Sequence, residues 1–142
     1  MSQTLDLMGA FIQKHHVLSL ATCNAGELSC CSVFYVYDSK NICFIFASSK
    51  ETTHIQHIEK NPNIAANILL ETDEIGRIEG LQIQGKVTLL KDKELQKLYF
   101  KKYPYALALL PTLWRLDVRS FKMTDNKLGF GKKLYYPEET TL

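Results

Sequence analysis

Three short runs rich in β-branched and aromatic residues follow one another early in the chain and constrain the fold more than any other feature of the sequence. They are VLSLATC at 17–23, LSCCSVFYVY at 28–37 and ICFIFA at 42–47. The turn formers Asn24-Ala25-Gly26 separate the first two runs, and Asp38-Ser39-Lys40-Asn41 separate the last two. Strands joined by such short turns pair antiparallel with their chain neighbours, so the sequence predicts an antiparallel meander.

Strands and helices then mix along the rest of the chain. Strand-like segments return at 63–71, 81–90 and 113–123, and helical segments are expected at 4–14, at 49–60 and from Asp92 onward, with Leu95, Leu98 and Tyr99 on one face. The second helix should end at Asn61-Pro62, because the residue before a proline is pushed out of the helical region. Gly85, inside a strand-like segment, predicts a bulge or a close backbone approach. We therefore expect one α+β domain over residues 1–142, a six-stranded antiparallel β-barrel with peripheral helices.

Composition and charge limit the classes of partner. The 142 residues are 46% apolar, enough for one buried core, and 17 basic side chains nearly balance 15 acidic ones. Residues 86–133 hold 12 basic and 4 acidic side chains, so any anionic partner should be sought near the C-terminal third. Their lysines lack aromatic residues placed for base stacking, and no nucleic-acid partner is predicted. No apolar stretch reaches the roughly 18 residues of a membrane helix and Met1–Lys14 lacks signal-peptide features, which predicts a cytoplasmic protein with no membrane partner.

The cysteines and histidines give little sign of a metal site. The four cysteines lie in strand-like segments and form no CxxC pair, so buried free thiols are expected at Cys23, Cys30, Cys31 and Cys43. The adjacent Cys30 and Cys31 should face opposite sides of a strand. His54 and His57 stand one helical turn apart, and His15 and His16 are adjacent. No third ligand has a recognisable spacing, so no metal site is predicted and His57 is expected to pack on its helix or lie at the surface.

The junction FIFASSKETTH at 44–54, where a strand runs into a helix, carries the strongest chemical signal. Ser48 and Glu51 have the spacing of a capping box. A helix start presents unpaired N–H groups at the positive end of its dipole, and the hydroxyls of 48–53 with Lys50 and His54 add donors. The segment is a candidate phosphate site, and an ordinary capped helix start is the alternative.

Three further features admit two interpretations each. Gly129-Phe130-Gly131-Lys132-Lys133 lacks the spacing of a nucleotide-binding loop, so it indicates a basic turn unless other residues join it. Gln82 and Gln84 share one face of a strand, where their amides pair with a heterocycle edge if that face lines a pocket. The apolar run from Tyr105 to Trp114 is a candidate contact with a second subunit.

The order of these elements resembles that of the FMN-binding split barrels of the pyridoxamine 5'-phosphate oxidase-like superfamily, over nearly the whole chain. Its more specific parts are FIFASSKETTHIQHIEKNPNIAANI at 44–68 and LQIQGKV at 81–87, and the ending FKMTDNKLGFGKK at 121–133 is similar to that of a small bacterial branch. The resemblance implies a homodimer that binds FMN in two equivalent clefts at its interface.

The resemblance also implies which residues meet the cofactor. Ala47 and Ser48 would contact the flavin, Thr52 to His54 would face its phosphate, and the second strand around Ser32 to Phe34 would line the isoalloxazine. Gln82 would lie near the flavin, and Trp114 would reach across from the other subunit. The candidate cofactor-binding residues are Ser32, Val33, Phe34, Ala47, Ser48, Ser49, Lys50, Thr52, Thr53, His54, Gln82, Trp114 and Lys132.

One departure from the family pattern leaves two functions open. Counted back from Pro62, the family's basic phosphate ligand falls on His54, and the position before it is Thr53. A flavoprotein with redox activity is the first expectation, since flavin N5 exchanges a hydride while the protein supplies orientation. A split-barrel binding module with weak or no flavin affinity and no catalysis is the alternative. Oxidation of pyridoxamine phosphate itself is not expected, because no cluster of basic residues suits that substrate's phosphate.

Overall fold

The structure, a computed structural model, describes residues 3–129 and 131–138. Its helices are α1 (Gln3–Lys14), α2 (Thr53–Lys60) and α3 (Lys93–Lys102), with short 3-10 helices η1 (Ile75–Arg77), η2 (Pro104–Leu109) and η3 (Asn126–Leu128). Its strands are β1 (Val17–Asn24), β2 (Glu27–Phe34), β3 (Val36–Asp38), β4 (Cys43–Ala47), β5 (Asn63–Leu69), β6 (Glu79–Leu89), β7 (Leu113–Asp125) and β8 (Lys133–Tyr136).

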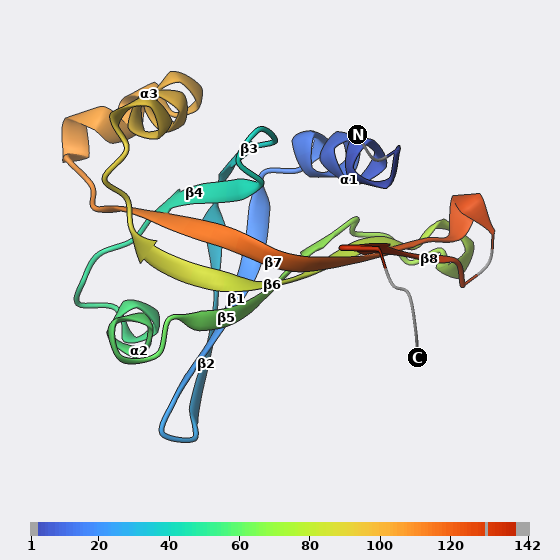
Figure 1. Cartoon of the computed structure of the whole chain (residues 1–142), viewed down its shortest axis with the longest axis horizontal. Coiled ribbons are helices and arrows are strands. Elements are labelled where there is room, and N and C mark those ends of the chain that lie inside the picture. Colours follow the sequence, from blue (N-terminus) through green and yellow to red (C-terminus); the bar gives the residue numbers. More distant parts are fainter. Residues whose placement is uncertain (1–2, 130, 139–142) are drawn as a thin grey trace.

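All the strands of the described residues form one antiparallel sheet in the order β2-β1-β5-β6-β7-β4-β3, with β8 also on β7. The 13-residue β7 organises the sheet, because its first half pairs with β4 and its second half with β8. The sheet curls into a half-barrel with α1, α2 and α3 outside it (Figure 1). The expected antiparallel barrel with outer helices is confirmed, with eight strands instead of six.

Two local predictions follow directly from turn and glycine chemistry and are confirmed. The β1–β2 hairpin closes through Ala25 and Gly26, both with positive φ (51° and 83°), as a two-residue turn that matches strand twist requires. The β6–β7 register shifts between Gln84 and Gly85, which marks a bulge. A Cβ at Gly85 would lie 2.4 Å from the Asp117 carbonyl oxygen, so the two strands approach this closely only because position 85 is glycine.

The predicted single strand at 28–37 is wrong, because the chain breaks at Tyr35 between β2 and β3. The Tyr35 side chain is buried and its hydroxyl donates to the carbonyl of Ile12 at 2.6 Å. Its backbone N–H donates to the carbonyl of His16 at 3.0 Å. These bonds tie the chain to the end of α1, a tertiary contact that strand propensity does not encode.

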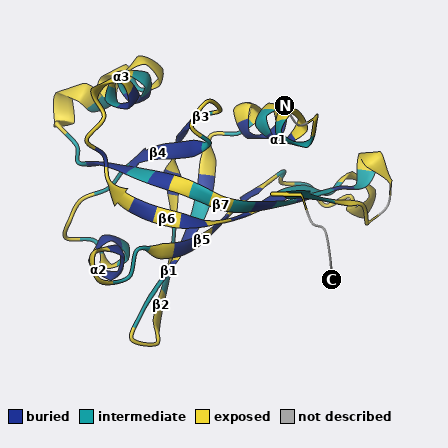
Figure 2. Ribbon diagram, viewed as in Figure 1, coloured by how far each residue is buried: buried dark blue, intermediate teal, exposed yellow. Residues whose placement is uncertain are grey.

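The core fills the inside of the curled sheet (Figure 2). Met8, Phe11 and Ile12 of α1 are buried against it, as the spacing of apolar residues in 4–14 predicts. The aromatic residues of the second and third predicted strands are also buried, except Phe34. A second, smaller apolar cluster holds α3 on β3 and β4 through Leu95 and Tyr99, and Asp92 caps α3 as expected.

All four cysteines are free thiols. Cys43 is buried and Cys23 and Cys31 are half-buried, but Cys30 is exposed, so the prediction of four buried thiols is wrong there. Cys30 points outward from β2, a strand at the edge of the sheet whose outer face no described helix covers, while Cys31 points inward. Within residues 3–129 and 131–138, no helix has the length and apolar character needed to span a membrane.

Candidate functional site

The junction between β4 and α2 begins at Ser48. Both its backbone N–H and its carbonyl form hydrogen bonds, one to Thr112, just before β7, and one to Trp114 in β7. The Ser48 N–H donates to the carbonyl of Thr112 at 3.1 Å. The Ser48 carbonyl accepts from the indole Nε1–H of Trp114 at 2.9 Å. The first residue after β4 is therefore held in place by the barrel wall.

The helix starts later than expected, because Thr52 and not Ser48 is its N-cap. The Thr52 hydroxyl oxygen accepts from the N–H of Ile55 at 3.3 Å, and the Thr52 N–H donates to the carbonyl of Ser49 at 3.2 Å. The Glu51 carboxylate accepts from the Ser49 hydroxyl at 2.7 Å, so no Ser48–Glu51 capping box exists. A tight turn at 49–52 thus replaces the first predicted turn of helix.

This later start turns His54 toward the end of β4. Its Nε2 lies 2.8 Å from the Ser48 hydroxyl oxygen and 3.4 Å from the Thr52 hydroxyl oxygen. Burial, aided by the charge of nearby His57, lowers the pKa of His54 below its ordinary value of 6.5. At neutral pH the cluster therefore consists of a neutral imidazole and two hydroxyls.

Hydrogen-bond donors surround this cluster. The amides of Thr53 and His54 lie in the first turn of α2, where backbone N–H groups have no intrahelical acceptor. Lys50 is exposed in the adjoining loop and is the lysine of that loop. Hydroxyls, first-turn amides and one lysine make a donor set suited to the oxygens of a phosphate or carboxylate.

His57, one turn further along α2, has a structural position. It is 6% exposed, and its Nδ1 lies 2.9 Å from the hydroxyl oxygen of Thr22 on β1. Its predicted role as a helix-packing residue is confirmed. Within the described ranges, no group of three His, Cys, Asp or Glu side chains could hold a metal ion.

A cavity of about 520 Å³ adjoins the junction on the side of η2. Leu109 and Leu110 form its apolar wall and are 80% and 84% exposed. Leu110 has a left-handed backbone (φ 47°), which is uncommon for a branched residue and holds this wall in a constrained turn. The full lining is Ala47, Ser48, Ser49, Lys50, Glu51, Leu109, Leu110, Pro111 and Thr112.

The β2 candidates lie some distance from the cluster. Ser32 and Phe34 are exposed on the outer face, whereas Val33 is buried and faces the core. Ser32 pairs with Ser19 on β1. Thr22, the β1 residue whose hydroxyl bonds to His57 of α2, lies three residues further along, so Ser19 and Thr22 are roughly 10 Å apart along the strand.

Gln82 and Gln84 do share one face of β6, the exposed outer one. They line a separate hollow of about 410 Å³ with residues of β7 and β8 that include Lys122 and Tyr135. Register places Ser32, Ser19, Asn67 and Gln82 in one row across four strands. Gln82 is therefore about 14 Å along the sheet from Ser32, which does not line the hollow that Gln82 borders.

The expectation that Trp114 reaches into another subunit is wrong. Its side chain is 3% exposed and packs in the core of its own chain, where the indole holds Ser48. The sequence alone does not predict this positioning role of Trp114 or the cavity wall formed by Leu109 and Leu110. The apolar run around Pro111 is the sequence signal for both, and it also suits a subunit contact.

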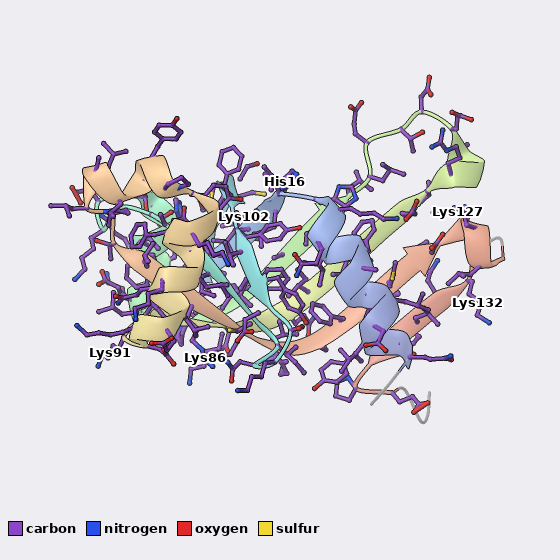
Figure 3. All side chains as sticks on the ribbon, turned by 90° about the horizontal axis from the view of Figure 1, so that it is seen from above. His16, Lys86, Lys91, Lys102, Lys127 and Lys132 are labelled. Carbon is purple, nitrogen blue, oxygen red and sulfur yellow. The ribbon has the colours of Figure 1, made fainter. Side chains whose placement is uncertain are left out.

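The basic C-terminal third does not form one patch. Figure 3 shows Lys86, Lys91 and Lys102 on the side of α3, and Lys127 and Lys132 at the opposite end of the molecule. Lys132 is thus far from the β4–α2 junction, and Phe130 of the same loop lies outside the described residues.

Comparison with known proteins shows the family to which the chain belongs. Residues 5–119 match the pyridoxamine 5'-phosphate oxidase family. A UPF0306 protein of Photorhabdus laumondii is 32% identical over 136 residues, which are 94% of this chain and 95% of the relative. An Enterobacter UPF0306 protein is 33% identical over 137 residues, 94% of this chain and 96% of that protein.

Solved structures with the same fold differ in what their names say they bind. A haem-binding protein of Mycobacterium smegmatis superposes with a TM-score of 0.77 at 14% identity, covering 95% of this chain and 58% of that one. Campylobacter jejuni ChuZ gives 0.75 at 19% identity, over 95% and 59% of the two chains. An FAD-binding protein of Mesorhizobium loti gives 0.68 at 13% identity, over 84% and 90%. The predicted split-barrel fold is confirmed, and at these identities the likeness concerns the fold alone.

Proposed function

Because the chain belongs to the pyridoxamine 5'-phosphate oxidase family, we propose that it is an FMN-binding flavoprotein that holds the cofactor phosphate at the β4–α2 junction of a homodimer. The observation that supports this most is the meeting of Ser48, Thr52 and His54 at the start of α2. These are three of the residues that the family resemblance assigns to the cofactor.

The residues present fit the phosphate through hydrogen bonding more than through charge. The hydroxyl of Ser48 and the amides of Thr53 and His54 would donate to phosphate oxygens, while Lys50 supplies one ammonium. The Thr52 hydroxyl caps the helix and already donates to the Ser49 carbonyl at 2.8 Å. The phosphate would therefore be bound more weakly than in a site built from several arginines.

FMN, when bound, supplies hydride exchange at N5 of the isoalloxazine. The chain's own residues bind and orient it. The exposed Phe34 offers an aromatic surface, and the indole of Trp114 keeps the Ser48 backbone in position. Leu109 and Leu110 give the cavity beside the junction an apolar wall.

The proposed homodimer interface is the exposed apolar surface of η2. Tyr105, Leu107, Leu109 and Leu110 are 92%, 53%, 80% and 84% exposed, an apolar surface of the kind that monomers seldom leave uncovered. A twofold axis through this surface would bury it against its own copy and border both candidate sites. Gln82, about 14 Å along the sheet from Ser32 within one chain, would then serve the site of the partner.

The assembly is tested by light scattering. We expect a mass near twice 16.3 kDa. Leu109→Glu should give monomers, because a charge in an apolar interface costs several kcal/mol. Leu28→Glu, at a leucine 81% exposed on the β1–β2 hairpin, is the matched control and should remain dimeric. A wild-type monomer at micromolar concentration contradicts the homodimer.

Cofactor binding is tested by titration with FMN, followed by quenching of flavin fluorescence. Wild-type protein should bind about one FMN per chain, and Ser48→Ala should bind several-fold more weakly because it loses one hydrogen bond to the phosphate. His54→Lys should bind FMN more tightly, because it supplies a permanent charge. A protein that is colourless as purified and does not quench FMN fluorescence contradicts the proposal.

The engagement of the titratable side chains at the junction favours a second candidate, a flavin-binding module without redox turnover. The Glu51 carboxylate beside the junction accepts from Ser49, and the Nε2 of His54 is hydrogen-bonded to Ser48, so both groups are already engaged. Addition of NADH or NADPH to the FMN complex separates the two functions. Bleaching of the visible flavin bands indicates a reductase, and unchanged bands with both donors indicate a binding module.

A further inference from the structure

His54 is the one member of the junction cluster that can change its charge near neutral pH. Its neighbours Ser48 and Thr52 are hydroxyls. The junction cluster can therefore make anion binding depend on pH near neutrality through His54.

The surroundings of His54 leave its charge uncompensated in the free protein. No carboxylate among residues 3–129 and 131–138 forms an ion pair with it, and Glu51 is engaged with Ser49. His57 is the titratable group that acts on it from α2, and β1 presents to His57 the neutral Thr22 hydroxyl. A proton on His54 would thus lack a partner until an anion arrives.

A phosphate monoester supplies that partner. Its second pKa is about 6, so it is mostly a dianion at pH 7.5, and an opposite charge within a few ångströms raises the pKa of an imidazole. The bound state then holds a larger share of protonated His54 than the free protein does at that pH. The proton comes from solvent and adds to the imidazole, and no covalent bond in the ligand breaks.

We propose that His54 is the specificity-determining residue for the phosphorylated flavin: it takes up a proton as the phosphate of FMN binds, so that FMN is preferred over riboflavin and the preference declines as the pH rises. This inference rests on the proposed function, since it assumes that the phosphate lies at the β4–α2 junction. It assigns to the histidine a role that a lysine or arginine would perform without any proton uptake.

Affinities for FMN and riboflavin, measured in parallel between pH 6.5 and 8.5, test this directly. If the phosphate raises the pKa of His54 into this range, FMN affinity should fall several-fold between pH 6.5 and 8.5 while riboflavin affinity stays constant. Calorimetry at pH 7.5 in buffers of different ionisation enthalpy should show uptake of a large fraction of one proton per FMN and none for riboflavin.

Three variants separate His54 from other causes. His54→Gln keeps a hydrogen-bonding side chain, and it should bind FMN with less pH dependence and no proton uptake. His54→Lys should bind FMN tightly at every pH in the range, and His16→Gln, at an exposed histidine outside the junction, should behave as wild type. Circular dichroism establishes that each variant is folded before the titrations are compared.

The outcomes distinguish this inference from the proposed function. FMN binding that is independent of pH, or proton uptake that persists in His54→Gln, overturns the role of His54 and leaves the flavin site standing. Equal affinities for FMN and riboflavin at pH 6.5 overturn it as well. Absence of FMN binding at every pH overturns the proposed function and this inference together.

Discussion

Trp114→Phe should weaken both the fold and the cofactor site, because the indole links the core to the junction. The substitution removes the donor of the 2.9 Å bond to the Ser48 carbonyl, and an unsatisfied buried acceptor costs about 1–3 kcal/mol. The smaller ring also leaves a space around a side chain that is 3% exposed, which costs about 1 kcal/mol more. We expect the free energy of unfolding to fall by about 2–4 kcal/mol.

Urea unfolding followed by circular dichroism measures this change, since the variant lacks the only tryptophan of the chain and with it most of the intrinsic fluorescence signal. Phe121→Leu is the control: it also trims a buried aromatic ring on β7 but does not touch Ser48. Both variants should lose stability, and only Trp114→Phe should lose FMN affinity, several-fold. A loss below about 0.5 kcal/mol, or equal FMN affinity in the two variants, would show that the bond from Trp114 to Ser48 does not hold the site.

Two further predictions concern the barrel and the histidine. Gly85→Ala should destabilise the protein by about 2–4 kcal/mol in the same unfolding assay, because the new Cβ meets the Asp117 carbonyl and the Leu116 side chain at less than contact distance. A variant as stable as wild type would show that the bulge relaxes freely. The lowered pKa of His54 means that the unfolded chain binds its proton more readily than the folded one, so this group's contribution to stability is present above pH 6.5 and is lost as the pH falls below it. Between pH 7.5 and 5.5 wild type should therefore lose more stability than His54→Gln, and an equal loss in both would show that His54 titrates alike in the two states.

Features that depend on a few adjacent residues were predictable from the sequence. Ala25 and Gly26 suit the positive φ values of a two-residue hairpin turn, and Asp92 caps α3 through its own side chain. Gly85 signalled the bulge because a strand interior rarely accepts glycine without a reason. Each of these signals acts locally, so no knowledge of distant contacts was needed.

Features that depend on distant contacts were not predictable in the same way. The break at Tyr35 requires acceptors from Ile12 and His16, and the late start of α2 leaves Ser48 free to meet His54. A capping box was a reasonable expectation from spacing alone, but the bonds of the Ser48 backbone to β7 favour a longer turn. Burial of Trp114 has the same origin, because only the pairing of β4 with β7 brings the indole under Ser48.

Chemical-shift mapping tests whether the phosphate of FMN binds at the β4–α2 junction. In a titration of ¹⁵N-labelled protein with FMN, we expect the largest shifts at the amides of Ser48, Thr52, Thr53 and His54. The same four amides should respond far less to riboflavin, which lacks the phosphate. Shifts concentrated elsewhere, such as the hollow around Gln82 and Lys122, with these four amides unmoved, would show that the phosphate does not bind at this junction.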